Sequence, residues 1–77
     1  MEDKIIEIIK KALECDQITA ESSTSNVSEW DSLGHLSVLS ALDEATNGRV
    51  SEIRDFNDVQ SVQDIVRVFE KHQVSFN

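Results

Sequence analysis

The chain has 77 residues, with 15 acidic against 7 basic side chains and a formal net charge of −8. A chain of this length makes one domain with a small core, because it buries only about 60% of its extended surface. The negative charge disfavours binding to nucleic acid and to anionic lipid and favours partners with basic patches, although the same charge also keeps a small domain soluble.

The composition excludes further classes. A single cysteine allows no intramolecular disulfide, and we expect no metal site. No apolar run approaches the roughly 20 residues that span a bilayer, and the charged residues 2–4 do not resemble a secretory signal. Proline is absent and there are only 2 glycines, which favours helices with polar connections. We expect one all-α domain over residues 1–77, monomeric, cytoplasmic and without membrane insertion.

Residues 3–15 are the first expected helix. Apolar side chains recur every three or four residues, which places them on one face of a helix packed on the core: Ile5, Ile8, Ile9, Ala12 and Leu13. Cys15 ends this helix between two acidic residues, where thiolate formation is disfavoured. We therefore expect Cys15 to be partly buried and structural.

Residues 16–30 are polar, with Ile18 and Val27 as isolated apolar anchors. A segment this long between two packed helices predicts a loop lying across the domain rather than a free linker. Trp30 is expected to cover the edge of the core, with a partner contact as the alternative.

Residues 32–46 are the second expected helix. Asp31 is a good N-cap, Ser32 is the first helical residue, and Asn47-Gly48 is a good left-handed stop. The expected inward face of this helix consists of Leu33, Leu36, Leu39 or Ser40, and Leu42. Val38 and Ala41 extend the apolar surface to a second side of the helix.

Two more helical segments follow. Residues 51–56 fit one or two turns with Ile53 and Phe56 pointing inward. Ser61 then caps the last helix, with Asp64 three residues on as a variant capping box. The cleanest helical stripe of the chain lies in this helix and comprises Val62, Ile65, Val66 and Phe69. We expect residues 73–77 to be a frayed tail.

The triplet Asp31-Ser32-Leu33 resembles the Asp-Ser-Leu modification site of acyl carrier proteins, whose serine receives 4′-phosphopantetheine from coenzyme A. The resemblance covers nearly the whole chain. It includes the distances from the serine to both chain ends, a following helix ending in Leu42-Asp43-Glu44, a short acidic connection and a last amphipathic helix. It implies a small four-helix bundle with three main helices, one short helix and a long first loop.

The resemblance also implies roles for single residues. Ser32 carries the prosthetic arm, and a phosphopantetheinyl transferase reads Asp31 and Leu33. The positions matching partner-docking residues are Leu36, Asp43 and Glu44. The positions matching an acyl pocket are Leu42, Val59, Val62 and Ile65. The protein itself is then no enzyme: its arm holds acyl or aminoacyl thioesters for acyl-loading and acyl-transfer enzymes with basic patches.

Two positions depart from the fatty-acid carriers. Gly34 stands where these usually have an aspartate, and Ser37 stands where they usually have a glutamate. The head of the helix is therefore less acidic, and His35 adds a titratable group beside the attachment site. These departures favour a specialised carrier, for instance in a polysaccharide, secondary-metabolite or aminoacyl pathway.

Other interpretations of Ser32 remain open. It could be an ordinary serine at a helix start. It could be a nucleophile with His35 as base, although nothing obvious orients the imidazole and the chain is too small to build a substrate cleft. The chain could also be a non-covalent adaptor, an acidic helical module whose second helix docks into a basic groove.

Overall fold

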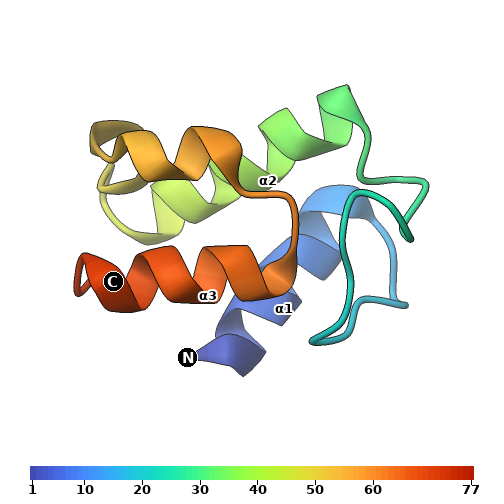
Figure 1. Cartoon of the computed structure of the whole chain (residues 1–77), viewed down its shortest axis with the longest axis horizontal. Coiled ribbons are helices and arrows are strands. Elements are labelled where there is room, and N and C mark those ends of the chain that lie inside the picture. Colours follow the sequence, from blue (N-terminus) through green and yellow to red (C-terminus); the bar gives the residue numbers. More distant parts are fainter.

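The structure is a computed structural model that describes residues 1–77 and contains three α-helices and no β-strand (Figure 1). In chain order the elements are α1 (Glu2–Leu13), α2 (Ser32–Ala45), the 3₁₀ helices η1 (Val50–Glu52) and η2 (Arg54–Asp58), and α3 (Val62–Lys71). Helix α1 packs against both α2 and α3. The prediction of a small all-helical domain is confirmed. None of the helices is long and apolar enough to cross a membrane.

The helix ends lie close to the predicted ones. Helix α1 stops at Leu13 because Glu14 adopts a left-handed conformation with φ of 53°, and its N–H bonds back to the carbonyl groups of the last turn. Cys15 therefore follows the helix and is half-buried, as expected. Helix α2 ends at Ala45, and the left-handed stop falls where it was predicted, with φ of 58° at Asn47 and 85° at Gly48.

The predicted inward face of α2 is wrong in its first two turns. Leu33 is 76% exposed and Leu36 is 64% exposed, whereas Val38 and Leu42 are fully buried. The inward stripe runs through positions 34, 38 and 42, which lie on one face because they are four residues apart. Its first member is Gly34. Apolar residues flank α2 on both sides, so hydrophobicity alone did not select the buried side.

The core consists of 17 buried hydrophobic residues drawn from every element and from the first loop. Its largest fully buried side chains are Trp30, Phe56 and Phe69. Trp30 thus belongs to the core, as predicted. In α3 the buried positions are Val62, Ile65, Val68 and Phe69, so Val68 takes the place expected for the half-buried Val66.

The C-terminal tail packs on the domain, contrary to the expected fraying of residues 73–77. Gln73, with φ of 53°, turns the chain back so that the Val74 N–H donates to Phe69 O at 2.9 Å. Val74 is only 3% exposed, and the ring of Phe76 lies 5.1 Å from that of Phe69. The N–H of Asn77 donates to the backbone oxygen of Ala45 at 2.9 Å. The tail therefore closes the end of the core where α2 finishes.

The long first loop lies across one end of the domain, at the right of Figure 1, as predicted. It is fixed to the start of α3 by an isolated antiparallel bridge between Ser23 and Ser61. The Thr24 N–H donates to Gln60 O at 2.9 Å, and the Val62 N–H donates to Ser22 O at 3.0 Å. This attachment holds the loop beside the start of α2.

Candidate functional site

Ser32 is exposed at the first position of α2. The preceding Asp31 is extended, and its Oδ1 accepts from the Gly34 N–H at 2.8 Å, so the predicted N-cap is confirmed. The His35 N–H donates to Asp31 O at 2.7 Å. The N–H groups of Ser32 and Leu33 have no acceptor within the protein, as is usual in a first helical turn. The hydroxyl group is thus accessible, next to two free amides at the positive end of the helix dipole.

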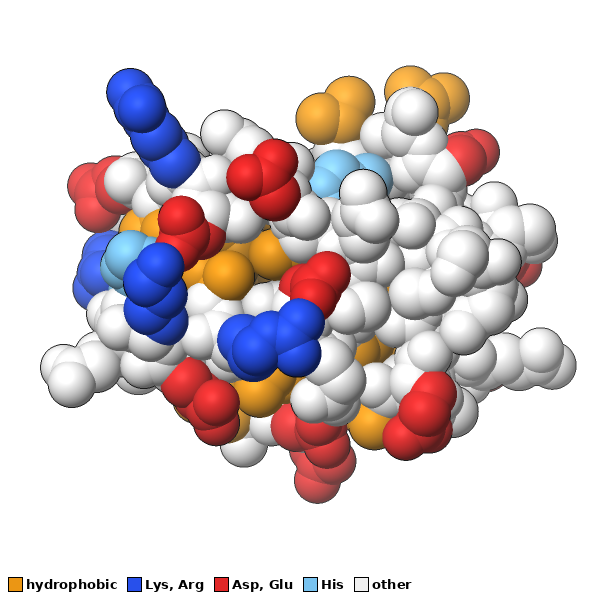
Figure 2. Space-filling model, in the orientation of Figure 1, with side chains coloured by type: hydrophobic (Ala, Val, Ile, Leu, Met, Phe, Trp, Pro, Cys, Tyr) orange, Lys and Arg blue, Asp and Glu red, His pale blue; other side chains and the backbone are white.

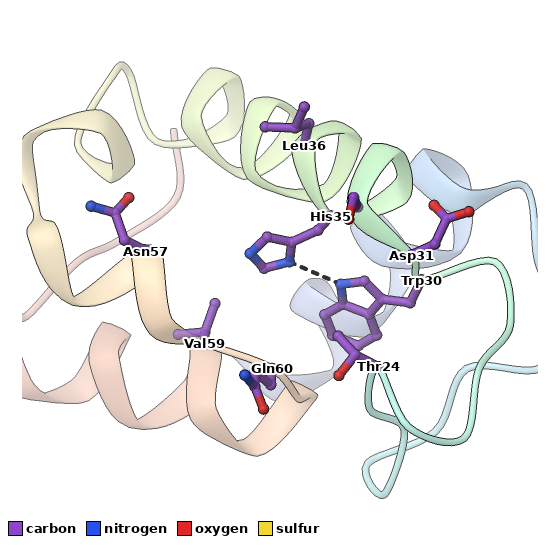
Figure 3. Close-up of a pocket in the computed structure, with 9 residues that line it drawn as sticks. Thr24, Trp30, Asp31, His35, Leu36, Asn57, Val59 and Gln60 are labelled. Carbon is purple, nitrogen blue, oxygen red and sulfur yellow. Dashed lines mark hydrogen bonds between the residues drawn. The ribbon is translucent and has the colours of Figure 1, made fainter.

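A cavity of about 640 Å³ opens beside Ser32 (Figure 3). Three segments form it: the start of α2, the end of the first loop and the segment that leads from η2 into α3. Its polar lining beyond Asp31 and Ser32 is neutral and comes from Thr24, His35, Asn57 and Gln60. Its apolar lining comes from Trp30, Leu36 and Val59.

His35 is oriented by Trp30. The indole Nε1–H donates to His35 Nδ1 at 3.1 Å, and the two rings lie edge to edge with centroids 6.4 Å apart and an interplanar angle of 25° (Figure 3). Because an indole nitrogen can only donate, Nδ1 must be the unprotonated nitrogen, and the neutral ring carries its proton on Nε2. The expectation that nothing orients this imidazole was therefore wrong.

Ser32 and His35 do not form a nucleophile–base pair. No hydrogen bond joins them, although both line the same cavity. The ring nitrogen that remains free carries the proton, so it can donate a hydrogen bond but cannot accept the proton of the Ser32 hydroxyl. The contacts of a hydrolytic serine are not assembled here.

The residues expected to dock partners lie in three different environments. Leu36 is exposed together with Leu33, and Figure 2 shows orange side chains projecting at the top, over the first half of α2. Glu44 is exposed. Asp43 is half-buried, and its Oδ1 accepts from the Ser51 N–H at 2.8 Å. The carboxylate of Asp43 thus ties η1 to the end of α2.

The four positions matched to an acyl pocket are buried. Leu42, Val62 and Ile65 have no exposed surface and line none of the cavities, whereas Val59, 3% exposed, lines the cavity at Ser32. A second cavity of about 390 Å³ lies between α2 and the 3₁₀ helices. Leu36 and Asn57 line both cavities, so the two adjoin.

Sequence reasoning missed the polar lining of the cavity. Thr24, Asn57 and Gln60 are exposed polar residues in loops or short turns, and nothing in their local pattern distinguishes them. They meet because the bridge between Ser23 and Ser61 holds the first loop against the start of α3. The pairing of Trp30 with His35 also depends on the path of the loop.

Comparison of the chain with known protein families, with curated proteins and with solved structures gives no match. A functional assignment therefore rests on the residues and contacts described above.

Proposed function

We propose that the protein is a phosphopantetheine-dependent carrier of acyl or aminoacyl groups, modified on Ser32 by a separate transferase. The observation that carries the proposal is the exposed Ser32 hydroxyl at the start of α2, directly after the capping Asp31. A buried serine, or one in the middle of a helix, could not enter the active site of a transferase. The resemblance of Asp31-Ser32-Leu33 to the carrier motif indicates the modification, which is the attachment of phosphopantetheine to the Ser32 hydroxyl.

The surroundings of Ser32 fit an esterified phosphate. The unpaired N–H groups of Ser32 and Leu33 can donate to phosphate oxygens, and the helix dipole favours a negative group at this end. The Asp31 carboxylate opposes a second negative charge, but its Oδ1 is held by the Gly34 N–H on the capping side. When bound, the prosthetic group supplies a thiol that holds the cargo as a thioester.

In this proposal the fold is a four-helix bundle of the acyl-carrier type. The three α-helices are the main helices, and the segment formed by η1 and η2 takes the place of the short fourth helix. The packed first loop and the C-terminal tail support the attachment end and the opposite end of α2. In this proposal the fold keeps the Ser32 hydroxyl exposed to solvent at the start of α2.

Partner enzymes dock along the outer side of α2. Leu33 and Leu36 offer an apolar contact beside the attachment site, and Glu44 with the net charge of −8 attracts basic patches. Asp43 contributes less than expected, because its carboxylate already binds the Ser51 N–H. The first turn of α2 contains no acidic side chain, which supports a carrier with specialised partners.

The test is intact mass spectrometry after incubation with coenzyme A and a promiscuous phosphopantetheinyl transferase. The wild type should gain the mass of one phosphopantetheine group, and Ser32→Ala should gain none. Ser40→Ala, which replaces an exposed serine in the same helix, is the matched control and should be modified like the wild type. Folded wild-type protein that stays unmodified with several transferases would falsify the proposal.

The second candidate is a non-covalent adaptor. The exposed pair Leu33 and Leu36 on an acidic domain favours it, because such a pair can enter a groove with basic walls. The two functions separate in the same experiment: an adaptor stays unmodified, and its partner binding survives Ser32→Ala.

A further inference from the structure

His35 offers an unused hydrogen-bond donor to the cavity beside Ser32. The Trp30 indole fixes the ring from one side, which leaves the proton on Nε2. In Figure 3 the ring extends from α2 toward the side of the cavity formed by Asn57 and Val59. His35 Nε2 has no hydrogen-bond partner within the protein. Every buried side-chain nitrogen or oxygen has a partner, so Nε2 is not buried, and His35 lines the cavity. A ligand acceptor can bind there.

The rest of the lining defines the chemistry of a ligand. Asn57 and Gln60 each provide an amide, and Thr24 provides a hydroxyl group, so every one of them can both donate and accept. No lysine or arginine lines the cavity, and Asp31 is its only carboxylate. Away from the free N–H groups at the start of α2, an anionic ligand finds no counter-charge, and a hydrocarbon chain leaves these polar groups without partners. The lining fits neutral groups such as amides.

Ser32 itself lines the cavity, so an arm attached to it begins there. The pantetheine part of the arm has two neutral amides separated by short apolar segments. The lining has the same mixed character, with Trp30, Leu36 and Val59 between its polar groups. We infer that this cavity is a docking site for the arm, in which His35 Nε2 and the Asn57 and Gln60 amides bind its amide groups. The inference rests on the proposed function, because it requires the arm on Ser32.

The cavity is formed before any arm arrives. Trp30 is 1% exposed, and the first loop is bonded to the other wall by the Thr24 N–H on Gln60 O at 2.9 Å. Docking therefore orders the arm without having to order these walls, which lowers the entropic cost of binding.

The test uses nuclear magnetic resonance on ¹⁵N-labelled protein before and after modification. Trp30 is the only tryptophan, so the spectrum has one indole N–H resonance, and that N–H bonds to His35. Conversion to the modified form, checked by intact mass, should shift this resonance and the side-chain amides of Asn57 and Gln60. Nuclear Overhauser effects should join protons of the arm to Val59. Ser32→Ala treated in the same way should show no shift.

Variants test the polar contacts. Asn57→Leu and Gln60→Leu each remove one amide from an exposed position, and each should lower the ratio of docked to free arm about two- to tenfold. The indole resonance of each modified variant then moves back toward its unmodified position. Gln17→Leu replaces an exposed glutamine that does not line this cavity, and it should behave as the wild type.

The outcomes distinguish this inference from the carrier proposal. If the mass shows complete modification but the indole, Asn57 and Gln60 resonances stay in place, docking is overturned and the carrier function stands. Modified Asn57→Leu and Gln60→Leu with wild-type shifts also overturn it. If no transferase modifies the protein, the carrier proposal and the docking site fail together.

Discussion

Gly34 and the backbone of Glu29 are in direct contact. A Cβ atom built on Gly34 would overlap the carbonyl oxygen of Glu29 and would lie 2.9 Å from Cδ2 of Leu13. The end of the first loop therefore lies directly on the first turn of α2, and this contact sets how the chain enters Asp31 and Ser32. The same contact gives a physical reason for a glycine at position 34.

Replacing Gly34 with alanine should destabilise the fold by about 1–3 kcal/mol, the usual cost of forcing extra atoms into a packed site. The loss is diagnostic, because alanine in an unobstructed helix is more favourable than glycine by about 1 kcal/mol. Urea unfolding measures the difference. Ser40→Ala on the exposed side of α2 is the control and should not lower stability. A Gly34→Ala variant as stable as the wild type would contradict the contact with Glu29.

Trp30 and His35 should be energetically coupled. His35→Ala leaves the N–H of the buried Trp30 indole without its acceptor at 3.1 Å and should cost about 1–3 kcal/mol. In a Trp30→Phe background there is no N–H to satisfy, so the same substitution should cost less. A double-mutant cycle of urea-unfolding free energies measures the coupling, expected at about 0.5–3 kcal/mol. Additive costs would show that the hydrogen bond contributes nothing.

Asp43 and Glu44 should respond differently to charge reversal. Asp43→Lys removes the acceptor of the Ser51 N–H and should lower the unfolding free energy by about 0.5–1.5 kcal/mol. Glu44→Lys changes an exposed side chain and should leave stability unchanged.

Glu44→Lys is therefore the cleaner probe of docking. It should slow modification of Ser32 by a transferase with a basic patch at low salt. The difference should shrink as salt is added, because exposed charges are screened over about 10 Å at 0.1 M. Glu44→Gln is the matched control and should show about half the effect, since it removes one charge instead of reversing it. Rates that do not depend on residue 44 at any salt concentration would exclude an electrostatic role for it.

The tail should contribute to stability. Val74→Ala removes two methyl groups from a side chain that is 3% exposed and should cost about 1.5 kcal/mol. Ser75→Ala, at the exposed neighbouring position, should cost nothing measurable. Thermal or urea unfolding compares the two. Equal stabilities would mean that the tail is frayed in solution, as the sequence suggested.

The ionised Asp55 carboxylate should contribute to the free energy of unfolding, and this contribution should disappear in acid. Hydrogen bonds from His72 and Lys71, both at 3.0 Å, hold the pKa of the Asp55 carboxyl below its usual value of 3.8. Since the folded pKa is the lower one, the contribution is fully present above the unfolded value and is lost as the pH falls through the folded pKa. The substitution Asp55→Asn removes this pH-dependent contribution to stability.

The stability difference between wild type and Asp55→Asn should therefore be constant just above about pH 5 and should decrease toward about pH 2. Urea unfolding across this range measures it. Asp58→Asn, which removes a carboxylate from an exposed position of the same 3₁₀ helix, is the matched control. A difference that grows as the pH falls would contradict the lowered pKa.

The sequence alone was enough for the features that depend on neighbours along the chain. The caps formed by Asp31 on the Gly34 N–H and by Ser61 on the Asp64 N–H were readable because a cap joins residues only three apart. The helix positions, the left-handed stop at Asn47-Gly48 and the exposed start of α2 at Ser32 followed from the same local rules.

The tertiary structure decided which face of α2 is buried, where the tail lies and what lines the cavity at Ser32. Each of these depends on contacts between segments far apart in the sequence: Gly34 beside Leu13, Asn77 on Ala45, and Thr24 on Gln60. Apolar residues flank α2 on both sides, so only the path of the loop and the packing of α1 could select the inward stripe. Burial is a property of the assembled core, and no local pattern encodes it fully.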